Sequence, residues 1–334
     1  MKRYTKTENM SFRPKAGRPE WRNLLIIFAT VCLTGCRYTF DLEGSDLKPM
    51  IALRSCICAD STAVIEVHKT VPVTEISKAD TALVNPAYSL RCNGKEVDAT
   101  CEMIGEGGMR ISSQAFRSGD RIEVTFSADG METVSAGTVI PDEFPEYTLD
   151  IHRNSQGYTS MKIRYKDNPD RADYYAVRIW WKGRSVIYDN NGEIVNEFPM
   201  ETSVKTYGNY DAIQIDPDAY SPQIVSAPGG DHIYFWSDED EADNEYEVKF
   251  SYSYSYDVEA GTPEDIELKC WFYTLSEELY KTMFADYDSS YNVFAGVGFS
   301  SPSFTYSNIR NGLGYFCGYR MSETGWFPLE EEDE

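Results

Sequence analysis

Hydrophobic and polar residues alternate in short runs along most of the chain, and a period of two residues is typical of β-strands. Asn93-Gly94 is the strongest hairpin signal, and further turns are predicted at Asp129-Gly130 and Asn191-Gly192. The runs that predict strands are 62–73, 88–104, 116–141, 158–167, 173–198, 245–259 and 265–275. The pattern therefore predicts an all-β protein.

The strand pattern is interrupted at 141–145, where two prolines and two acidic residues predict a domain boundary. Before it, we predict an immunoglobulin-like β-sandwich over residues 49–141. After it, we predict a larger β-sandwich domain over residues 146–325, followed by an acidic tail at 326–334. Two domains also suit the length of the chain, which exceeds the usual size of a single hydrophobic core.

One segment departs from the period of two. Four apolar or aromatic residues recur there at the spacing of one helix face. They are Tyr280, Met283, Phe284 and Tyr287. Just before them, Thr274 and Glu277 have the spacing of a capping box. We therefore predict a helix near residues 276–288, packed against the sheet of the second domain.

The start of the chain has the pattern of an export signal. Basic residues precede a nearly unbroken apolar run at 24–33, about half as long as a bilayer span requires. Leu33-Thr34-Gly35-Cys36 then resembles the lipobox of bacterial lipoproteins. We predict a signal peptide at 1–35, counted from Met1 or with Met10 as the true start. Cys36 would carry the lipid and residues 36–48 would form a tether; the alternative is an ordinary signal peptide with an unmodified cysteine.

Net charge narrows the choice of partners. The chain has 31 basic and 54 acidic residues, of which the predicted signal peptide holds seven and two, so residues 36–334 carry a net charge of −28. Such a surface repels phosphate groups and anionic lipid headgroups. We therefore expect no nucleic-acid partner, and membrane contact through the N-terminal lipid alone.

Six cysteines follow Cys36, and an exported chain meets an oxidising compartment in which disulfides form. The disulfide candidates are Cys56, Cys58, Cys92, Cys101, Cys270 and Cys317. The simplest division is two bridges among the first four cysteines and one between the last two. Residues two apart in a strand do not pair readily with each other, and the pairing among the four stays open.

Other candidate sites are few. Asp238, Asp240 and Asp243 lie close enough in sequence to share a calcium ion, although the alternative is a solvated loop between strands. Trp180-Trp181 and the stripe Tyr252/Tyr254/Tyr256 are candidate surfaces for sugar stacking or for a partner. Adjacent strand residues face opposite ways, so at least one of the two tryptophans is expected in the core. No hydrolase, metalloprotease or phosphate-binding motif occurs in the sequence, and we expect neither a cofactor nor catalysis.

The C-terminal stretch YSNIRNGLGYFCGYRMSE (306–323) resembles the closing motif of a family of Bacteroidota lipoproteins, domain-of-unknown-function family 4249. The resemblance rests on Asn308-Ile309, Asn311 and Leu313-Gly314-Tyr315-Phe316. The passages SGDRIEVTFSADG, YKDNPDRADYYAVRI and YTLSEELYKTM agree in order, so it covers nearly the whole chain after Cys36. The cysteines and the long basic start depart from the family pattern.

The resemblance implies an outer-membrane lipoprotein beside a TonB-dependent transporter, and it transfers no catalytic residue. We therefore predict a non-enzymatic, lipid-anchored protein, on the cell-surface side, that acts as an accessory or ligand-capture subunit of such a transporter. The alternative is a surface adhesin or fimbria-like structural protein. An enzyme such as a glycosidase is a third hypothesis.

Overall fold

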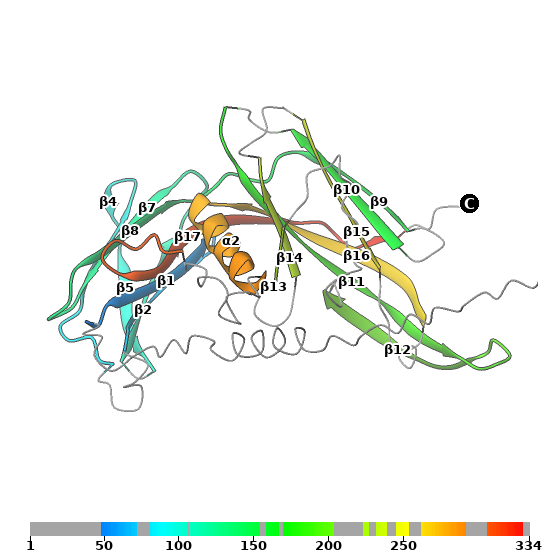
Figure 1. Cartoon of the computed structure of the whole chain (residues 1–334), viewed down its shortest axis with the longest axis horizontal. Coiled ribbons are helices and arrows are strands. Elements are labelled where there is room, and N and C mark those ends of the chain that lie inside the picture. Colours follow the sequence, from blue (N-terminus) through cyan, green and yellow to red (C-terminus); the bar gives the residue numbers. More distant parts are fainter. Residues whose placement is uncertain are drawn as a thin grey trace, which may run out of the picture. The chain divides into compact units, whose positions relative to one another are not determined.

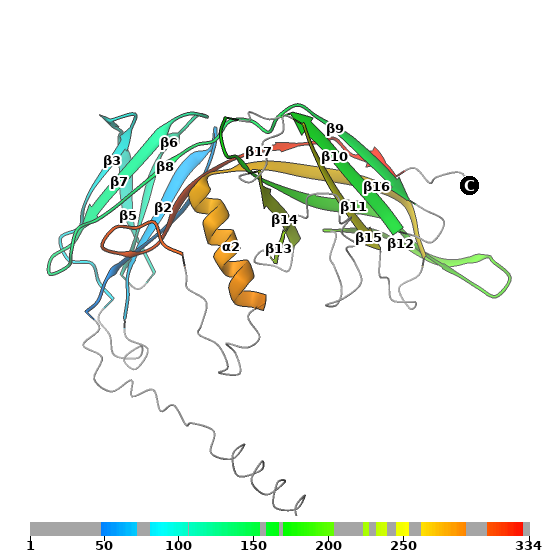
Figure 2. The same ribbon diagram turned by 45° about the horizontal axis from the view of Figure 1, so that its top comes forward.

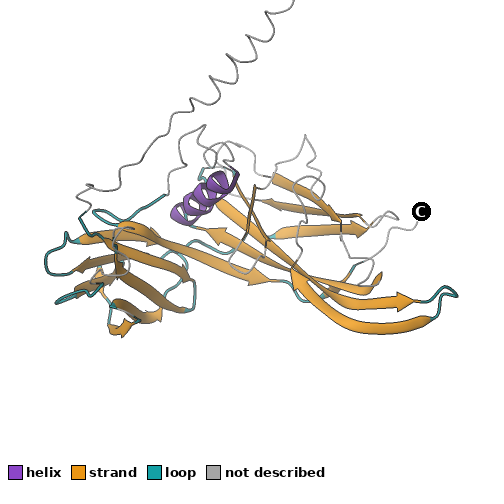
Figure 3. Ribbon diagram, turned by 60° about the horizontal axis from the view of Figure 1, so that its bottom comes forward, coloured by secondary structure: helices purple, strands orange, loops and turns teal. Residues whose placement is uncertain are grey.

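The computed structural model describes residues 48–71, 81–105, 107–153, 158–166, 170–203, 223–226, 232–238, 245–253, 262–291 and 306–329. Within these ranges the chain forms three β-sheets and one helix (Figures 1 and 3). The predicted all-β class is therefore confirmed. The predicted signal peptide, Cys36 and most of the tether lie outside the described residues.

The N-terminal part is a β-sandwich in which two sheets pack face to face. Its strands are β1 (Ile51–Cys58), β2 (Thr62–Lys69), β3 (Ala87–Cys92), β4 (Lys95–Glu96), β5 (Ala99–Ile104), β6 (Gly108–Ala115), β7 (Arg121–Ser127) and β8 (Val134–Val139). Strands β1, β2, β6 and β5 lie side by side in one sheet, and β4, β3, β7 and β8 form the other. Leu53 and Val67 from the first sheet share a core with Val124 and Phe126 from the second. The predicted hairpin at Asn93 is confirmed, because β3 and β4 pair across it.

The C-terminal part contains longer strands. They are β9 (Tyr147–Arg153), β10 (Tyr158–Lys166), β11 (Tyr174–Tyr188), β12 (Ile194–Ser203), β13 (Gln223–Ser226), β14 (His232–Ser237), β15 (Glu245–Ser253), β16 (Thr262–Leu275), β17 (Leu313–Glu323) and β18 (Phe327–Pro328). The antiparallel pair β11–β16 forms its centre. Alternate residues of β11, among them Ile179 and Trp181, share a core with Met161 and Ile163 of β10 and with Phe272 of β16. The opposite face of β11 and β16 carries a second buried cluster at one end, which includes Ala176 and Leu275, and polar and amphipathic side chains along the rest.

Strand β17 joins the two parts in one sheet. It pairs antiparallel with β16 and parallel with β1, so the strand order runs β13-β14-β11-β16-β17-β1-β2-β6-β5. The sequence pattern predicts that residues 313–323 belong to the second domain alone. That assignment needs correction, because seven residues of β17 pair with β1, from Ala52↔Leu313 to Cys58↔Tyr319. Parallel pairing needs no local turn, which explains why the hydrophobic pattern did not reveal it.

The helix α2 (Glu277–Tyr291) packs on one face of this sheet, against β17 and β13 as well as β11 and β16 (Figure 2). Its predicted position is confirmed, and its face places Leu279, Tyr280 and Met283 against buried residues of β11, β14 and β16. Phe284, predicted on the same face, is 41% exposed. No helix in the described part of the chain combines the length and the apolar character that crossing a membrane requires.

The predicted capping box is wrong. Thr274 belongs to strand β16, and the N-cap is Ser276, whose hydroxyl accepts a hydrogen bond from the Leu279 N–H at 3.3 Å. The same hydroxyl accepts the Gly318 N–H at 3.1 Å. Ser276 therefore both begins the helix and fixes it to β17. The capping-box spacing is misleading here because the predicted strand 265–275 already includes Thr274, so strand and helix signals overlap at that residue.

Candidate functional site

The outward face of β11 and β16 carries an ordered set of aromatic and charged side chains. Arg178, Trp180 and Lys182 alternate along β11, while their neighbours Val177, Ile179 and Trp181 face the core. The strand register pairs these outward residues with outward residues of β16: Arg178↔Trp271, Trp180↔Lys269 and Lys182↔Glu267. We call the six residues Arg178, Trp180, Lys182, Lys269, Trp271 and Trp326 the tryptophan face.

Cations and indole rings contact one another throughout the tryptophan face. The rings of Trp180 and Trp271 meet edge to face, with centroids 5.6 Å apart. The guanidinium carbon of Arg178 lies 5.2 Å from the Trp180 centroid and 5.6 Å from that of Trp271. The ammonium of Lys269 lies 5.0 Å from the Trp271 ring. These are cation–π distances, and the rings are half-buried, which strengthens such contacts.

Carboxylates complete the tryptophan face. Glu323 of β17 accepts the Trp271 indole N–H at 2.9 Å and lies 2.7 Å from the Lys269 ammonium. The pKa of Glu323 is lowered, chiefly by the hydrogen bond from Lys269. Lys182 is ion-paired with Glu267 at 2.5 Å and lies 4.6 Å from the Trp326 ring. The indole N–H of Trp180 is buried, and no acceptor among the described residues takes its hydrogen bond.

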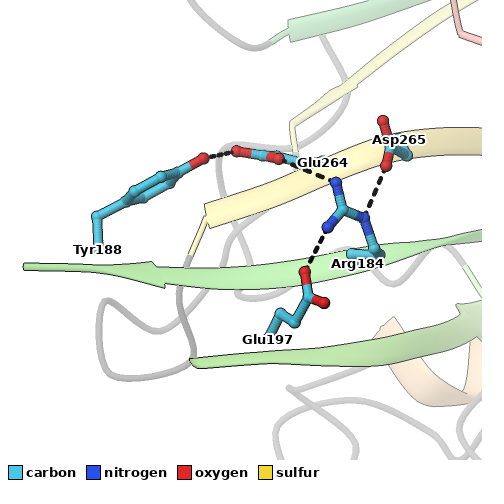
Figure 4. A network of polar contacts seen from close by, with 5 residues as sticks. All are labelled: Arg184, Tyr188, Glu197, Glu264 and Asp265. Carbon is cyan, nitrogen blue, oxygen red and sulfur yellow. Dashed lines mark hydrogen bonds and ion pairs between the residues drawn. The ribbon is translucent and has the colours of Figure 1, made fainter. Parts of the chain in front are cut away.

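Next to Lys182, a second polar network surrounds Arg184 (Figure 4). The Arg184 guanidinium donates to Asp265 at 2.7 Å, lies 3.5 Å from Glu264, and is also bonded to Glu197 of β12. The Tyr188 hydroxyl donates to the second oxygen of Glu264. The pKa of Arg184 is raised, with the hydrogen bond to Asp265 as the largest cause. One cation is thus held by three carboxylates from two strands.

The backbone makes room for this network. The β11–β16 register shifts between Lys182 and Arg184, and Asp265 has a left-handed φ of 50°. A Cβ atom at Gly183 would lie 2.6 Å from the Glu264 carbonyl oxygen, so the close approach of the two strands requires glycine here. The bulge places Arg184 and Glu264 side by side.

Lys182 also lines an open cavity of about 1130 Å³. The charged part of its wall comes from Lys182, Arg184, Glu201, Glu264, Asp265 and Glu267. Met200, Pro328 and Leu329 supply an apolar part. The cavity therefore continues the tryptophan face, and together they offer ring-stacking surface beside paired charges.

The two adjacent tryptophans are divided as predicted. Trp181 is 7% exposed and belongs to the core, whereas Trp180 lies half-buried on the opposite face. The sequence pattern indicates Trp180 as a candidate surface residue, but it does not point to Trp271, Trp326 or the three cations. The sequence does show that Lys269 and Trp271 alternate with apolar residues along a strand. It does not show the strand register that places them beside Trp180. Of the tyrosine stripe, Tyr252 lies in β15 and Tyr254 and Tyr256 lie outside the described residues.

Of the three calcium candidates, the structure describes Asp238 alone. Asp238 is 4% exposed, and its carboxylate accepts the Asp173 backbone N–H at 2.6 Å. It thus ties the end of β14 to the start of β11. Asp240 and Asp243 lie outside the described residues, and the described part contains no cluster of three metal-ligating side chains.

All six described cysteines are free thiols. The predicted pairing of Cys270 with Cys317 is wrong, because Cys270 lies opposite Thr324, whose N–H donates to the Cys270 carbonyl at 3.0 Å. Seven residues of an extended strand separate Thr324 from Cys317, about 23 Å. The neighbour of Cys317 is instead Cys56 of β1, with the two sulfurs 3.9 Å apart. Cys92 and Cys101 lie on β3 and β5 in different sheets.

Comparison with known proteins places this chain in a family. A search of curated proteins found no match. Among solved structures, the Yersinia pseudotuberculosis adhesin InvE aligns at 9% identity over 68% of this chain and 55% of that one, with a TM-score of 0.19. The family described as a domain of unknown function, DUF4249, matches residues 37–324. That match spans the helix and every strand described above except β18, and the chain belongs to the DUF4249 family.

Proposed function

We propose that this protein is a non-enzymatic, lipid-anchored protein of the outer membrane that captures a ligand or partner for a TonB-dependent transporter. The lipobox-like sequence at Cys36 supports the anchor. The tryptophan face is the observation that carries the capture role. Tryptophan and arginine are the residue types that most often dominate binding energy at protein interfaces, and indole rings also stack on sugar rings.

The location of these residues strengthens the proposal. A chain with a net charge of −23 gathers Arg178, Lys182 and Lys269 on one small surface, each within contact distance of an indole ring. Structural tryptophans satisfy their packing in the core, as Trp181 does. Half-exposed tryptophans on an outward sheet face leave part of each ring available to a binding partner.

The decisive experiment is an affinity purification of the tagged protein from native membranes in mild detergent, with mass spectrometry of bait and partners. We expect the bait to begin at an acylated Cys36 and to bring down a TonB-dependent transporter. The variant Trp180→Leu/Trp271→Leu should lose the partner, because leucine keeps the strand covered but removes the rings and their cation contacts. The matched control is Met103→Ala on β5, since Met103 is 74% exposed and distant in sequence.

Each contrary result has a definite meaning. A bait that is recovered alone contradicts the transporter role, and a ladder of bait multimers favours the adhesin alternative. If the double tryptophan variant retains the partner, the partner binds to a surface other than the tryptophan face. Protease treatment of intact cells tests the proposed cell-surface side, where we expect the protein to be degraded while periplasmic markers survive.

A further inference from the structure

Two cysteines far apart in the sequence face each other across neighbouring strands. Cys56 of β1 and Cys317 of β17 are register partners in the parallel pair, and their sulfurs lie 3.9 Å apart although 261 residues separate them. Cα atoms of neighbouring strands are about 4.8 Å apart, within the range that a disulfide bridges. Small rotations about the Cα–Cβ bonds bring the sulfurs to bonding distance.

We propose that Cys56 and Cys317 form a disulfide by thiol–disulfide exchange, and that this bond locks the β1–β17 junction on which the joint sheet depends. The other described thiols have different surroundings. Cys270 lies in the core of the C-terminal part, and Cys58 is the register partner of Tyr319. The proposed pair differs from the division that cysteine spacing suggests.

The environments of the two thiols suit a stepwise exchange. Cys56 is exposed, whereas Cys317 is fully buried. The hydrogen bond from Cys317 lowers the pKa of the Cys56 thiol, and the same contact with burial raises the pKa of Cys317. Cys56 is therefore the thiolate that attacks first, because nucleophilic attack requires both ionisation and access.

The balanced reaction uses an external disulfide as the oxidant. The Cys56 thiolate attacks one sulfur of that disulfide, the external S–S bond breaks, and the first external thiol leaves. Cys317 then loses its proton and attacks the Cys56 sulfur of the mixed disulfide, which releases the second external thiol. The protein gives up two electrons and two protons, and the external disulfide is reduced to two thiols.

Oxidation should make the junction markedly more stable. The bond would close a loop of 261 residues in the unfolded chain, and long loops lose the most conformational entropy on closure. It would also hold β1, the first strand after the predicted tether, to β17 near the C-terminus. Any pull on the lipid-anchored end is then carried by a covalent bond as well as by strand pairing.

The test is peptide mapping of the purified full-length protein after equilibration with glutathione disulfide, using alkylation without reduction. We expect one cross-linked peptide pair containing Cys56 and Cys317, which disappears on reduction. Cys58→Ser is the matched control and should keep the cross-link, whereas Cys56→Ser should abolish it and leave Cys317 alkylated after unfolding. The oxidised protein should melt on the order of 5 °C above the reduced one.

Two results would overturn the inference: free Cys56 and Cys317 after equilibration, or a cross-link that joins Cys56 to another cysteine. The wild-type mapping alone decides this, so a variant that fails to fold does not remove the test. In the cell, formation of this disulfide rests on the proposed export to an oxidising compartment. The test with glutathione disulfide does not depend on export, because it supplies the oxidant to the purified protein. Mapping the protein from native membranes then reports on the compartment alone.

Discussion

The side-chain amide of Asn308 forms two hydrogen bonds with the backbone of Phe316. Its nitrogen donates to the Phe316 carbonyl at 2.8 Å, and its oxygen accepts the Phe316 N–H at 2.9 Å. The amide thus replaces the neighbouring strand that β17 lacks at this point, where Phe316 is completely buried. This explains in physical terms why the closing motif begins with asparagine.

Replacing Asn308 should therefore destabilise the fold. In Asn308→Ala, a buried N–H and a buried carbonyl lose their partners, and we expect a decrease of about 2–4 kcal/mol in the free energy of unfolding, measured with urea. Asn311→Gly is the control, because it keeps the left-handed backbone (φ 59°) and removes one exposed hydrogen bond. Equal effects of the two substitutions would contradict the role assigned to Asn308.

Gly314 should tolerate no side chain. It has a φ of 105°, and a Cβ atom would lie 2.0 Å from the carbonyl oxygen of Leu53, its register partner on β1. We expect Gly314→Ala to lower the free energy of unfolding by about 3 kcal/mol or more and to loosen β1–β17 pairing. Amide hydrogen exchange across β1 measures the second effect.

The matched control is Gly94→Ala in the first hairpin. Gly94 also has a positive φ, 78°, but a Cβ atom there would meet nothing within 4 Å. Gly94→Ala should lower the free energy of unfolding by only about 1–2 kcal/mol, the cost of placing alanine in a left-handed backbone conformation. A Gly314 variant no worse than the Gly94 variant would show that the close approach to Leu53 relaxes easily.

Substitutions at the actual N-cap and at the residue predicted for it should have different effects on stability. Ser276→Ala removes an acceptor used by two backbone N–H groups, and should cost about 1–2 kcal/mol in urea unfolding. Thr274→Val should be neutral or stabilising, because the buried Thr274 hydroxyl has no hydrogen-bond partner among the described residues. The reverse order would restore the capping box predicted from sequence.

The turn at Asp120 predicts a pH effect. Its carboxylate accepts the Arg117 N–H and the Asn93 amide, both at 2.8 Å, and the Arg117 hydrogen bond is the largest cause of its lowered pKa. A carboxyl with a lowered folded-state pKa contributes stability above its unfolded pKa and loses it as pH falls through the folded pKa. We therefore expect the free energy of unfolding to decrease as the pH falls below 3.8, the ordinary pKa of an aspartate. The decrease should be smaller in Asp120→Asn.

Carboxyl NMR titration checks this effect directly. The Asp120 pKa should lie below 3.8 in the folded protein and return to the ordinary value in urea. An unchanged value on unfolding would contradict the effect assigned to the hydrogen bonds that Asp120 accepts from Arg117 and Asn93.

The sequence by itself determined most of the local structure. Alternation identified strands such as β2 and β7, Asn93-Gly94 marked the first hairpin, and helical spacing located α2, because each signal depends on residues close together in the chain. The cap was misplaced by two residues since strand and helix signals overlap at Thr274. Local patterns also separated Trp180 from Trp181.

Only the tertiary structure decided which strands far apart in the sequence are neighbours. The parallel pair β1–β17 brings together residues about 260 positions apart, and nothing in the local pattern of either strand encodes that register. The same pairing replaces the expected partner of Cys317 by Cys56. The tryptophan face likewise depends on the register of β11 with β16, since a shift of one residue would turn Trp271 to the opposite side of the sheet.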